Sequence, residues 1–203
     1  MSNVAPFNIL MAVGDVYIAP IGTVFPDPDE APSVAWAKLG TLGIEDFSED
    51  GVTLTHEQSV NEFMGAGSTI PRKASRVSEN MTVSLKLVDL TLEQYKHALN
   101  ENAITTTAAA AGTPAKKEIN LYQGVDVSTL ALLVRNHSPY SGDSGSFLQY
   151  QLPCVYQSGN PEVVFVKGDA AGIALEFKSL RDPNAVSAAA SFGKIIAYTA
   201  AAL

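Results

Sequence analysis

Residues 52–57 read Val-Thr-Leu-Thr-His-Glu, and residues 81–88 read Met-Thr-Val-Ser-Leu-Lys-Leu-Val. Apolar and polar side chains alternate in both stretches, as they do along a β-strand, where successive side chains point to opposite faces. Val52, Leu54 and His56 would therefore share one face of the first strand. This two-residue period predicts strands that bury one face in a core and leave the other face polar.

Strand signals continue on both sides of this pair. Residues 25–32 contain three prolines and predict a loop, and Asp50-Gly51 is a dipeptide that tight hairpin turns favour. So many strand signals predict a mainly β fold, a sandwich or barrel, in a single domain spanning residues 1–203. The further strands that we expect cover residues 14–23, 36–40, 118–123, 129–136, 147–156, 162–166, 171–180 and 191–199.

One stretch has a helical period instead. Leu92, Tyr95 and Leu99 follow one another at helical spacing, and Thr91 is placed to cap the start of a helix. We therefore expect one flanking α-helix at about residues 91–100.

Two stretches show no clear period and predict loops: residues 58–76, and the Ala- and Thr-rich residues 103–117. A connection as long as the first is uncommon in a compact domain and is normally functional or disordered. It carries Phe63, Met64 and Ile70, which are residue types that disordered segments avoid. We therefore predict that residues 58–76 form a docking loop.

The basic cluster of the chain falls in the same stretch and comprises Arg72, Lys73 and Arg76. Such a trio is commonly a solvated face. In a docking loop, however, it would meet an acidic segment of a neighbouring molecule.

The acidic residues are unevenly distributed. Residues 1–57 hold nine of the 21 acids against one base, Lys38, so this segment carries the whole net charge of −8. One interpretation is a solubilising surface. The other is a wall from which polyanions are repelled, which argues against a conventional nucleic-acid binder. The acids nearest the first alternating strand are Glu45, Asp46, Glu49, Asp50 and Glu57.

Catalytic signals are weak. Ser144, in Gly-Asp-Ser-Gly-Ser, resembles the nucleophile of chymotrypsin-like proteases, but neither His56 nor His97 has the setting of the catalytic base. The carboxylates of residues 45–50 include no pair with the spacing that hydrolysis needs, and residues 27–30 lack the glycine and distal glutamate of a calcium loop. No histidines pair at zinc-ligand spacing. We expect a protein that is not an enzyme and has no cofactor.

Composition favours assembly over secretion. Charged residues make up only 17% of the chain, so it can bury a core and also cover surface against other subunits. A single cysteine, Cys154, excludes an internal disulfide. No apolar run has membrane-span length, and residues 1–6 lack the basic start of a secretory signal. We expect the protein to be made and used in a cytoplasm.

Three segments carry a family likeness. Residues 13–23, Val-Gly-Asp-Val-Tyr-Ile-Ala-Pro-Ile-Gly-Thr, resemble the start of major tail tube proteins of long, non-contractile-tailed bacteriophages. Residues 36–40, Trp-Ala-Lys-Leu-Gly, and 47–52, Phe-Ser-Glu-Asp-Gly-Val, resemble their next segment. The likeness covers mainly residues 10–100, and tubes from phages of actinobacteria are the most similar.

The resemblance implies a β-sandwich or barrel whose subunits form six-membered rings, with their sheets joined into an inner barrel. Stacked rings would make a hollow tail through which genomic DNA passes without specific binding. By position, residues 58–76 match the loop that the family uses to contact the next ring. Residues 187–203, which are Ala-rich, would be an extended terminal arm.

The five acids from Glu45 to Glu57 would then be candidates to line the lumen. The resemblance also implies partners: further copies of the chain, a tape measure protein, a tail terminator and distal tail proteins. The protein would reside in the virion tail after assembly in the host bacterial cytoplasm. The alternative is another β-rich virion component, such as a head decoration or tail-completion protein, or a secretion-system tube relative.

Overall fold

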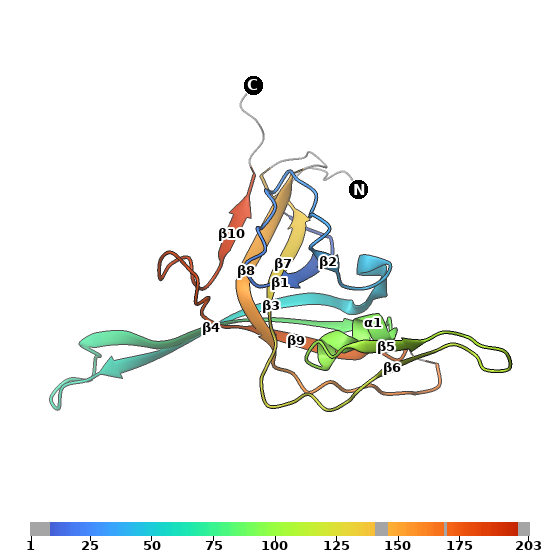
Figure 1. Ribbon diagram of the computed structural model, residues 1–203. Helices are drawn as coiled ribbons and strands as arrows, with labels where there is room; N and C mark the ends of the chain where they lie inside the picture. Colours follow the sequence, from blue (N-terminus) through green and yellow to red (C-terminus); the bar gives the residue numbers. More distant parts are fainter. Residues whose placement is uncertain (1–8, 141–145, 169, 199–203) are drawn as a thin grey trace, which may run out of the picture.

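The computed structural model describes residues 9–140, 146–168 and 170–198, and it contains an eight-stranded antiparallel sheet and a separate two-stranded hairpin (Figure 1). The sheet order is β2-β1-β7-β8-β9-β4-β3, and β10 also pairs with β8. The fold is therefore mainly β with one short helix, as predicted. The strands are β1 (Asp15–Pro20), β2 (Ala37–Lys38), β3 (Phe47–Phe63), β4 (Lys73–Leu87), β5 (Ile104–Thr107), β6 (Lys116–Ile119), β7 (Thr129–His137), β8 (Phe147–Gln157), β9 (Ile173–Ser179) and β10 (Lys194–Ala197). The helical turns are η1 (Gly43–Asp46), α1 (Leu92–Tyr95) and η2 (Lys96–Ala98).

Strand β8 joins the two halves of the sheet. Its residues 148–151 pair with β10 and its residues 155–157 pair with β9, while β7 pairs along the other edge. The register with β7 shifts beside Pro153, which has no backbone N–H to donate to the ladder. In Figure 1 the strands β7, β8 and β10 stand upright, and β3, β4 and β9 run across below them.

The main core lies between these two halves. Val16 of β1 and Leu132 of β7 are fully buried in one cluster with Val83 of β4 and with Leu175 and Phe177 of β9. Since apolar faces of both halves point inward, the halves pack as the layers of a sandwich do.

The alternating strand at residues 81–88 is confirmed. Met81, Val83, Leu85 and Leu87 are buried, and the residues between them are partly exposed. Each buried side chain removes apolar surface from water, which stabilises the fold by roughly 1.5–3 kcal/mol for a large aliphatic residue. The strands predicted around residues 14–23, 129–136, 147–156, 171–180 and 191–199 are confirmed as β1, β7, β8, β9 and β10.

The predicted loop at residues 58–76 was wrong in its secondary structure. Strand β3 continues to Phe63 and β4 begins at Lys73, and these two residues pair. Only residues 64–72 connect the strands. Neither face of this part of the β3–β4 pair is buried. Apolar and polar residues therefore need not alternate here, and the sequence shows no two-residue period.

The Asp50-Gly51 dipeptide is not a hairpin turn. It lies inside β3, at a register shift between Phe47 and Val52, where Gly51 has φ of 65°. A glycine at positive φ serves a β-bulge as readily as a turn, and the dipeptide alone does not distinguish the two.

Residues 103–117 were also predicted as a loop, but they contain β5 and the start of β6, which pair from Ile104↔Ile119 to Thr107↔Lys116. Threonine is β-branched and suits an exposed strand. The alanines between the strands obscured this signal.

The helix predicted at residues 91–100 is shorter, because the helical turns end at Ala98. Asn100 has φ of 58°, and its side chain donates a 2.7 Å hydrogen bond to the carbonyl oxygen of Gln123. This contact, distant in sequence, holds Asn100 in a left-handed conformation that no helix continues through. Thr91 makes no capping hydrogen bond with its side chain.

Three predicted strands are reduced. Residues 36–40 contribute only the two residues of β2, residues 118–123 contribute only the end of β6, and residues 162–166 contribute a single bridge from Val163 to Ile173.

The described part of the predicted terminal arm, residues 187–198, does not extend away from the body, because β10 pairs with β8. Residues 199–203 lie outside the described residues. No helical segment in the described ranges is long and apolar enough to cross a membrane.

Candidate functional site

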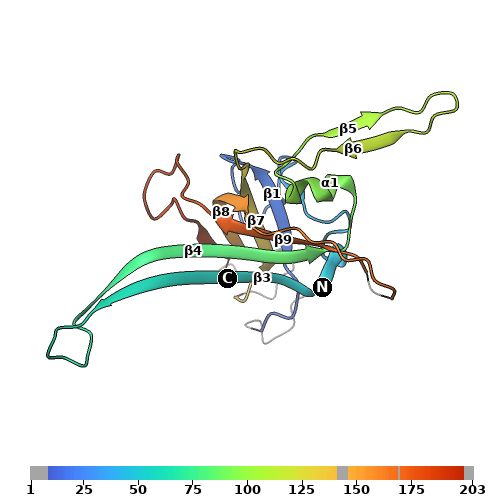
Figure 2. The same ribbon diagram turned by 90° about the horizontal axis from the view of Figure 1, so that it is seen from below.

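The β3–β4 hairpin projects from the body as an arm, residues 58–79 (Figures 1 and 2). Residues 73–79 of β4 are all exposed, so the arm reaches roughly 20 Å beyond the buried part of the strand at about 3.3 Å per residue. An isolated two-stranded hairpin is marginally stable in water. The exposed apolar side chains on the arm are Val60, Phe63, Met64, Ile70 and Val77.

The tip of the arm, residues 63–73, has internal order. The N–H of Arg72 donates a 2.8 Å hydrogen bond to the carbonyl oxygen of Phe63. The hydroxyl of Ser68 donates a 2.8 Å hydrogen bond to the carbonyl oxygen of Ile70. Phe63 is 63% exposed and Ile70 is 72% exposed. The tip therefore presents apolar side chains on a defined backbone, which is typical of an interaction surface.

The three predicted basic residues separate into two groups. Arg76 donates a 3.0 Å hydrogen bond to the side chain of Gln58 across the arm and lies 3.3 Å from Glu79, so it stabilises the arm itself. Arg72 and Lys73, at the tip, make no ion pair with any acidic side chain of the described residues. These two cations are free to meet a partner.

The five predicted lumen acids do not form one cluster. Glu45 and Asp46 belong to η1, before β3 begins, and the Asp46 carboxylate accepts a 2.5 Å hydrogen bond from the N–H of Leu42. Glu57 lies ten residues along β3 from its start, which is about 30 Å away in an extended strand. Asp46 is therefore a structural residue of a tight turn. Glu49 and Asp50, exposed beside the bulge, stay predictions.

The polar face opposite the core is made by β3, β4 and β9 and is here called the outer face. Thr53 of β3 pairs with Ser84 of β4, which pairs with Glu176 of β9. The next row pairs Thr55, Thr82 and Lys178. Glu57 and Lys86 also belong to the outer face. Its two acids, Glu57 and Glu176, balance its two bases, Lys86 and Lys178, so the face is rich in hydroxyl groups and close to neutral. The strand alternation predicted this polar face and placed Lys86 on it, but it did not predict that Glu176 and Lys178 of β9 belong to the same face.

Acidic side chains also lie on a fixed loop, residues 25–32, here called the acidic loop. Pro26 and Pro28 are buried, while Asp27, Asp29 and Glu30 are exposed. Three side chains from β7 and β8 donate to its carbonyl groups: Gln151 to Pro26 at 3.3 Å, Gln149 to Asp27 at 3.3 Å, and Arg135 to Pro28 at 3.1 Å.

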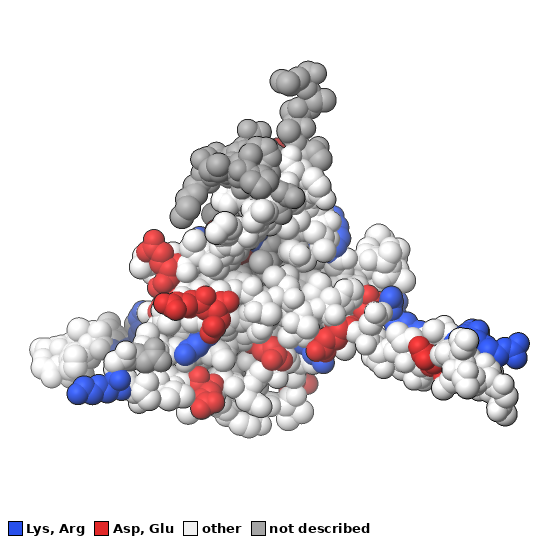
Figure 3. Space-filling model, turned by 180° about the vertical axis from the view of Figure 1, so that it is seen from behind, with Lys and Arg blue, Asp and Glu red and all other residues white. Residues whose placement is uncertain are grey.

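This hydrogen-bonded row explains why a proline-rich loop has a defined position. Because prolines have fixed φ, little further entropy is lost when their carbonyl groups are bound. The row holds three carboxylates outward at one place on the surface. Figure 3 shows acidic side chains on the body of the molecule and basic side chains along both projecting hairpins.

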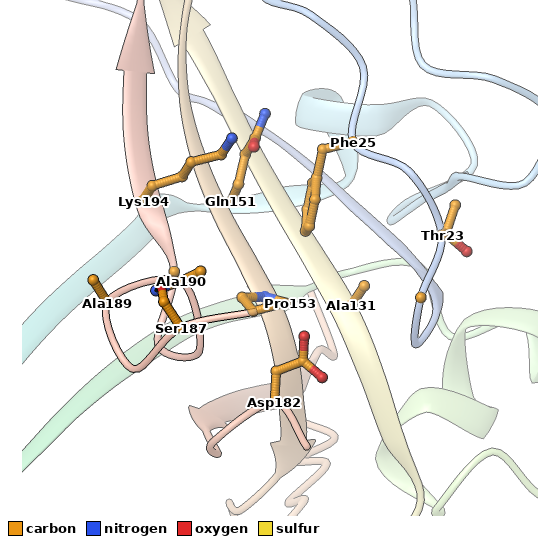
Figure 4. A pocket seen from close by; sticks show the side chains of 12 residues that line it. Thr23, Phe25, Ala131, Gln151, Pro153, Asp182, Ser187, Ala189, Ala190 and Lys194 are labelled. Atoms are coloured by element: carbon orange, nitrogen blue, oxygen red, sulfur yellow. Dashed lines mark hydrogen bonds between the residues drawn. The ribbon is translucent and has the colours of Figure 1, made fainter. Parts of the chain in front are cut away.

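A groove of about 550 Å³ lies beside the acidic loop, over β7 and β8. Figure 4 shows Phe25 on one side and the segment before β10 on the other, with Ala131 and Pro153 on the strands between them. Ala189 and Ala190 line the second side. The lining is mostly apolar, as in pockets that bind peptides or small molecules.

Five polar residues line the groove: Thr23, Gln151, Asp182, Ser187 and Lys194. Gln151 is 2% exposed, and its amide nitrogen donates to the carbonyl oxygen of Pro26 and to Gln149. Its Oε1 has no hydrogen-bond partner in the described part of the chain. A buried acceptor without a donor destabilises the fold by about 1–3 kcal/mol.

The second hairpin, β5–β6, projects on the other side of the body (Figure 2). The side-chain amide of Asn102 donates to the carbonyl oxygens of Asn120 and Tyr122 and closes its base. Lys117 pairs with Glu93 of α1 at 2.5 Å. Sequence reasoning missed this hairpin, whose threonines were the available signal.

The histidines considered as catalytic bases pair with carboxylates. His56 Nε2 lies 2.8 Å from Glu79 Oε1, and His97 Nδ1 pairs with Glu101. Ser144 lies outside the described residues. No group of three or more His, Cys, Asp and Glu side chains that could hold a metal ion occurs in residues 9–140, 146–168 and 170–198.

Comparison with models of known protein families gives no match for this chain, and comparison with curated proteins gives no relative.

Proposed function

We propose that this chain is a structural subunit that polymerises as stacked rings into the hollow tail tube of a long, non-contractile-tailed bacteriophage. The observation that carries the proposal is the arm. Its described residues include five exposed apolar side chains and two tip cations without an acidic partner, on a hairpin too thin to have its own core. Such a segment is stabilised when a neighbouring subunit covers it.

The position of the arm favours open-ended assembly. It points away from its own body, so a surface that covers it lies on another copy, and we propose that this surface is not the other copy's arm. A contact between two different surfaces is heterologous, and it generates rings where the rotation closes and filaments where it does not. A tube of stacked rings contains both outcomes: contacts within each ring close, and contacts between rings continue without closing.

The sheet edges support lateral joining within a ring. Strand β3 has 17 residues and pairs only with β4, which leaves a long free edge in the described structure. Free edges of this length lead to aggregation in monomeric proteins unless they are covered. Pairing with the next subunit would satisfy the free backbone groups.

The outer face is a suitable lumen wall. Its threonine and serine hydroxyls and its balanced charges offer no basic patch to hold phosphates, and the net charge of −8 on each subunit repels DNA. DNA would therefore pass without being retained. Acids at the mouth of such a channel, with Glu57 as a candidate, would add to this repulsion.

Electron microscopy of the purified chain tests the proposal, with an arm-shortened variant beside it. Gln58 pairs with Glu79, so replacing residues 59–78 by Asn-Gly would close the hairpin with a two-residue turn. We expect rings or rods from the unaltered protein and folded, unassembled subunits from the variant. Unimpaired rod growth by the variant would contradict the role of the arm. A closed oligomer that never extends would favour a head decoration or tail-completion role instead.

A further inference from the structure

We propose that the groove beside the acidic loop is the receptor for the arm tip of a second copy of this chain. This inference rests on the proposed function, because it names the surface on which the arm would dock. The groove and the arm tip, residues 63–73, match in two respects.

The first match is apolar. The groove is lined by Phe25, Ala131 and Pro153 and by Ala189 and Ala190, and its volume of about 550 Å³ is large enough for several side chains. The arm tip exposes Phe63, Met64 and Ile70. Burying these three side chains against the apolar wall of the groove would remove apolar surface from water and so favour the contact.

The second match is electrostatic. Asp182 lies in the groove, and the acidic loop beside it exposes Asp27, Asp29 and Glu30, against the single lysine that lines the groove, Lys194. The arm tip carries Arg72 and Lys73. Opposite charges around an apolar contact raise the association rate and select the correct partner.

Cysteine cross-linking of the full-length chain tests this placement under conditions in which it assembles. A mixture of the Met64→Cys and Ala190→Cys proteins should give disulfide-linked dimers after brief oxidation, since a disulfide forms only when the two Cα atoms come within about 7 Å. A chain that carries both Met64→Cys and Ala190→Cys should give a series of disulfide-linked oligomers of increasing size. The native Cys154 is buried and stays in place. The matched control pairs Met64→Cys with Ala174→Cys, an exposed alanine on the outer face, and should give no such dimer.

A second variant tests the same groove without a cross-link. Ala190→Trp places a large side chain at an exposed position of the wall, so the thermal transition should be unchanged while assembly falls at least tenfold. Normal assembly by Ala190→Trp, together with no Met64–Ala190 cross-link, would overturn the groove assignment and leave the proposed function standing. A cross-link from Ala190→Cys to a cysteine placed in residues 1–8 would overturn it as well, since the chain's own start would then occupy the groove. Failure of the unaltered protein to assemble would remove both proposals.

Discussion

Arg135 Nη2 donates a 3.1 Å hydrogen bond to the carbonyl oxygen of Pro28, which precedes it by 107 residues. The same guanidinium lies 4.2 Å from the centre of the Phe147 ring. Burial lowers the pKa of Arg135, and the negative charges of Asp15 and Asp29 oppose this effect. The hydrogen bond from Arg135 to Pro28 holds the acidic loop to β7, which gives this buried cation a structural role.

Arg135→Ala should therefore lower the free energy of unfolding by about 2–3 kcal/mol, the usual range for losing a hydrogen bond from a charged group. Urea denaturation measures this change. Arg181→Ala, at an exposed arginine, is the control and should change stability by less than about 0.5 kcal/mol. Equal effects of the two substitutions would show that the acidic loop is not held through Arg135.

Leu85→Ala should cost about 3 kcal/mol of stability, because Leu85 is buried between the two halves of the sheet and its removal leaves a cavity. Ser84→Ala, one residue earlier on the outer face, should be within about 0.5 kcal/mol of the unaltered protein. Chemical denaturation of both proteins distinguishes the two faces of β4. A large loss from Ser84→Ala would mean that the outer face is packed in the folded monomer.

Glu101 predicts a pH dependence of stability. Burial alone would raise its pKa, but the hydrogen bond from His97 and the positive charges of His97 and Lys96 together hold the pKa below the usual value of 4.5. A carboxylate whose pKa is lower in the folded state stabilises that state above the unfolded pKa, and this stabilisation is lost as pH falls through the folded value.

Glu101→Gln should thus be less stable than the unaltered protein at pH 6–7, and the difference should shrink below about pH 4. Measuring the free energy of unfolding of both proteins from pH 3 to 7 tests this expectation. Glu162→Gln, at an exposed carboxylate, serves as the matched control. A stability difference for Glu101→Gln that stays constant down to pH 3 would contradict the coupling to His97.

Removal of the apolar arm tip should affect assembly but not folding. The double change Phe63→Ser and Ile70→Ser alters side chains that contact solvent in the subunit, so the thermal transition should move little. Sedimentation should show loss of polymers, since the apolar contact with the neighbour is gone. Val24→Ser, at another exposed apolar residue outside the arm, should assemble normally.

The tip cations predict a salt-dependent assembly rate. Arg72→Glu with Lys73→Glu should slow polymer growth by tenfold or more at low salt, because unlike charges steer association. Light scattering at several salt concentrations measures the rate. The difference should narrow in high salt, where exposed charges are screened. Lys167→Glu, in a loop elsewhere, is the control, and an equal slowing by it would point to net charge alone.

Much of the fold was predictable because burial leaves a pattern in the chain. The alternation from Met81 to Leu87 identified a strand with one face in the core, and the apolar run at residues 129–136 identified a buried central strand. The arm and the β5–β6 hairpin left no such pattern, since neither face of them is buried in the subunit. Residues 58–76 and 103–117 were for this reason predicted as loops, although strands occupy most of the first and part of the second.

The candidate sites also divide into one that the sequence predicted and one that it did not. Composition placed Phe63, Met64, Ile70, Arg72 and Lys73 together, because they are neighbours along the chain. The groove could not be predicted, since Phe25, Gln151 and Ala190 come from three distant segments that meet only when β10 pairs with β8.

The sequence by itself thus determined a charge-poor, mainly β chain with an acidic first quarter and an apolar, basic segment suited to docking. These properties depend on residue type and on local period. The tertiary structure alone decided that this segment is a pair of strands, that Asp46 serves a turn, and that a groove lies beside a fixed acidic loop. Each of these depends on hydrogen bonds and packing between residues far apart in the chain, which local sequence does not encode.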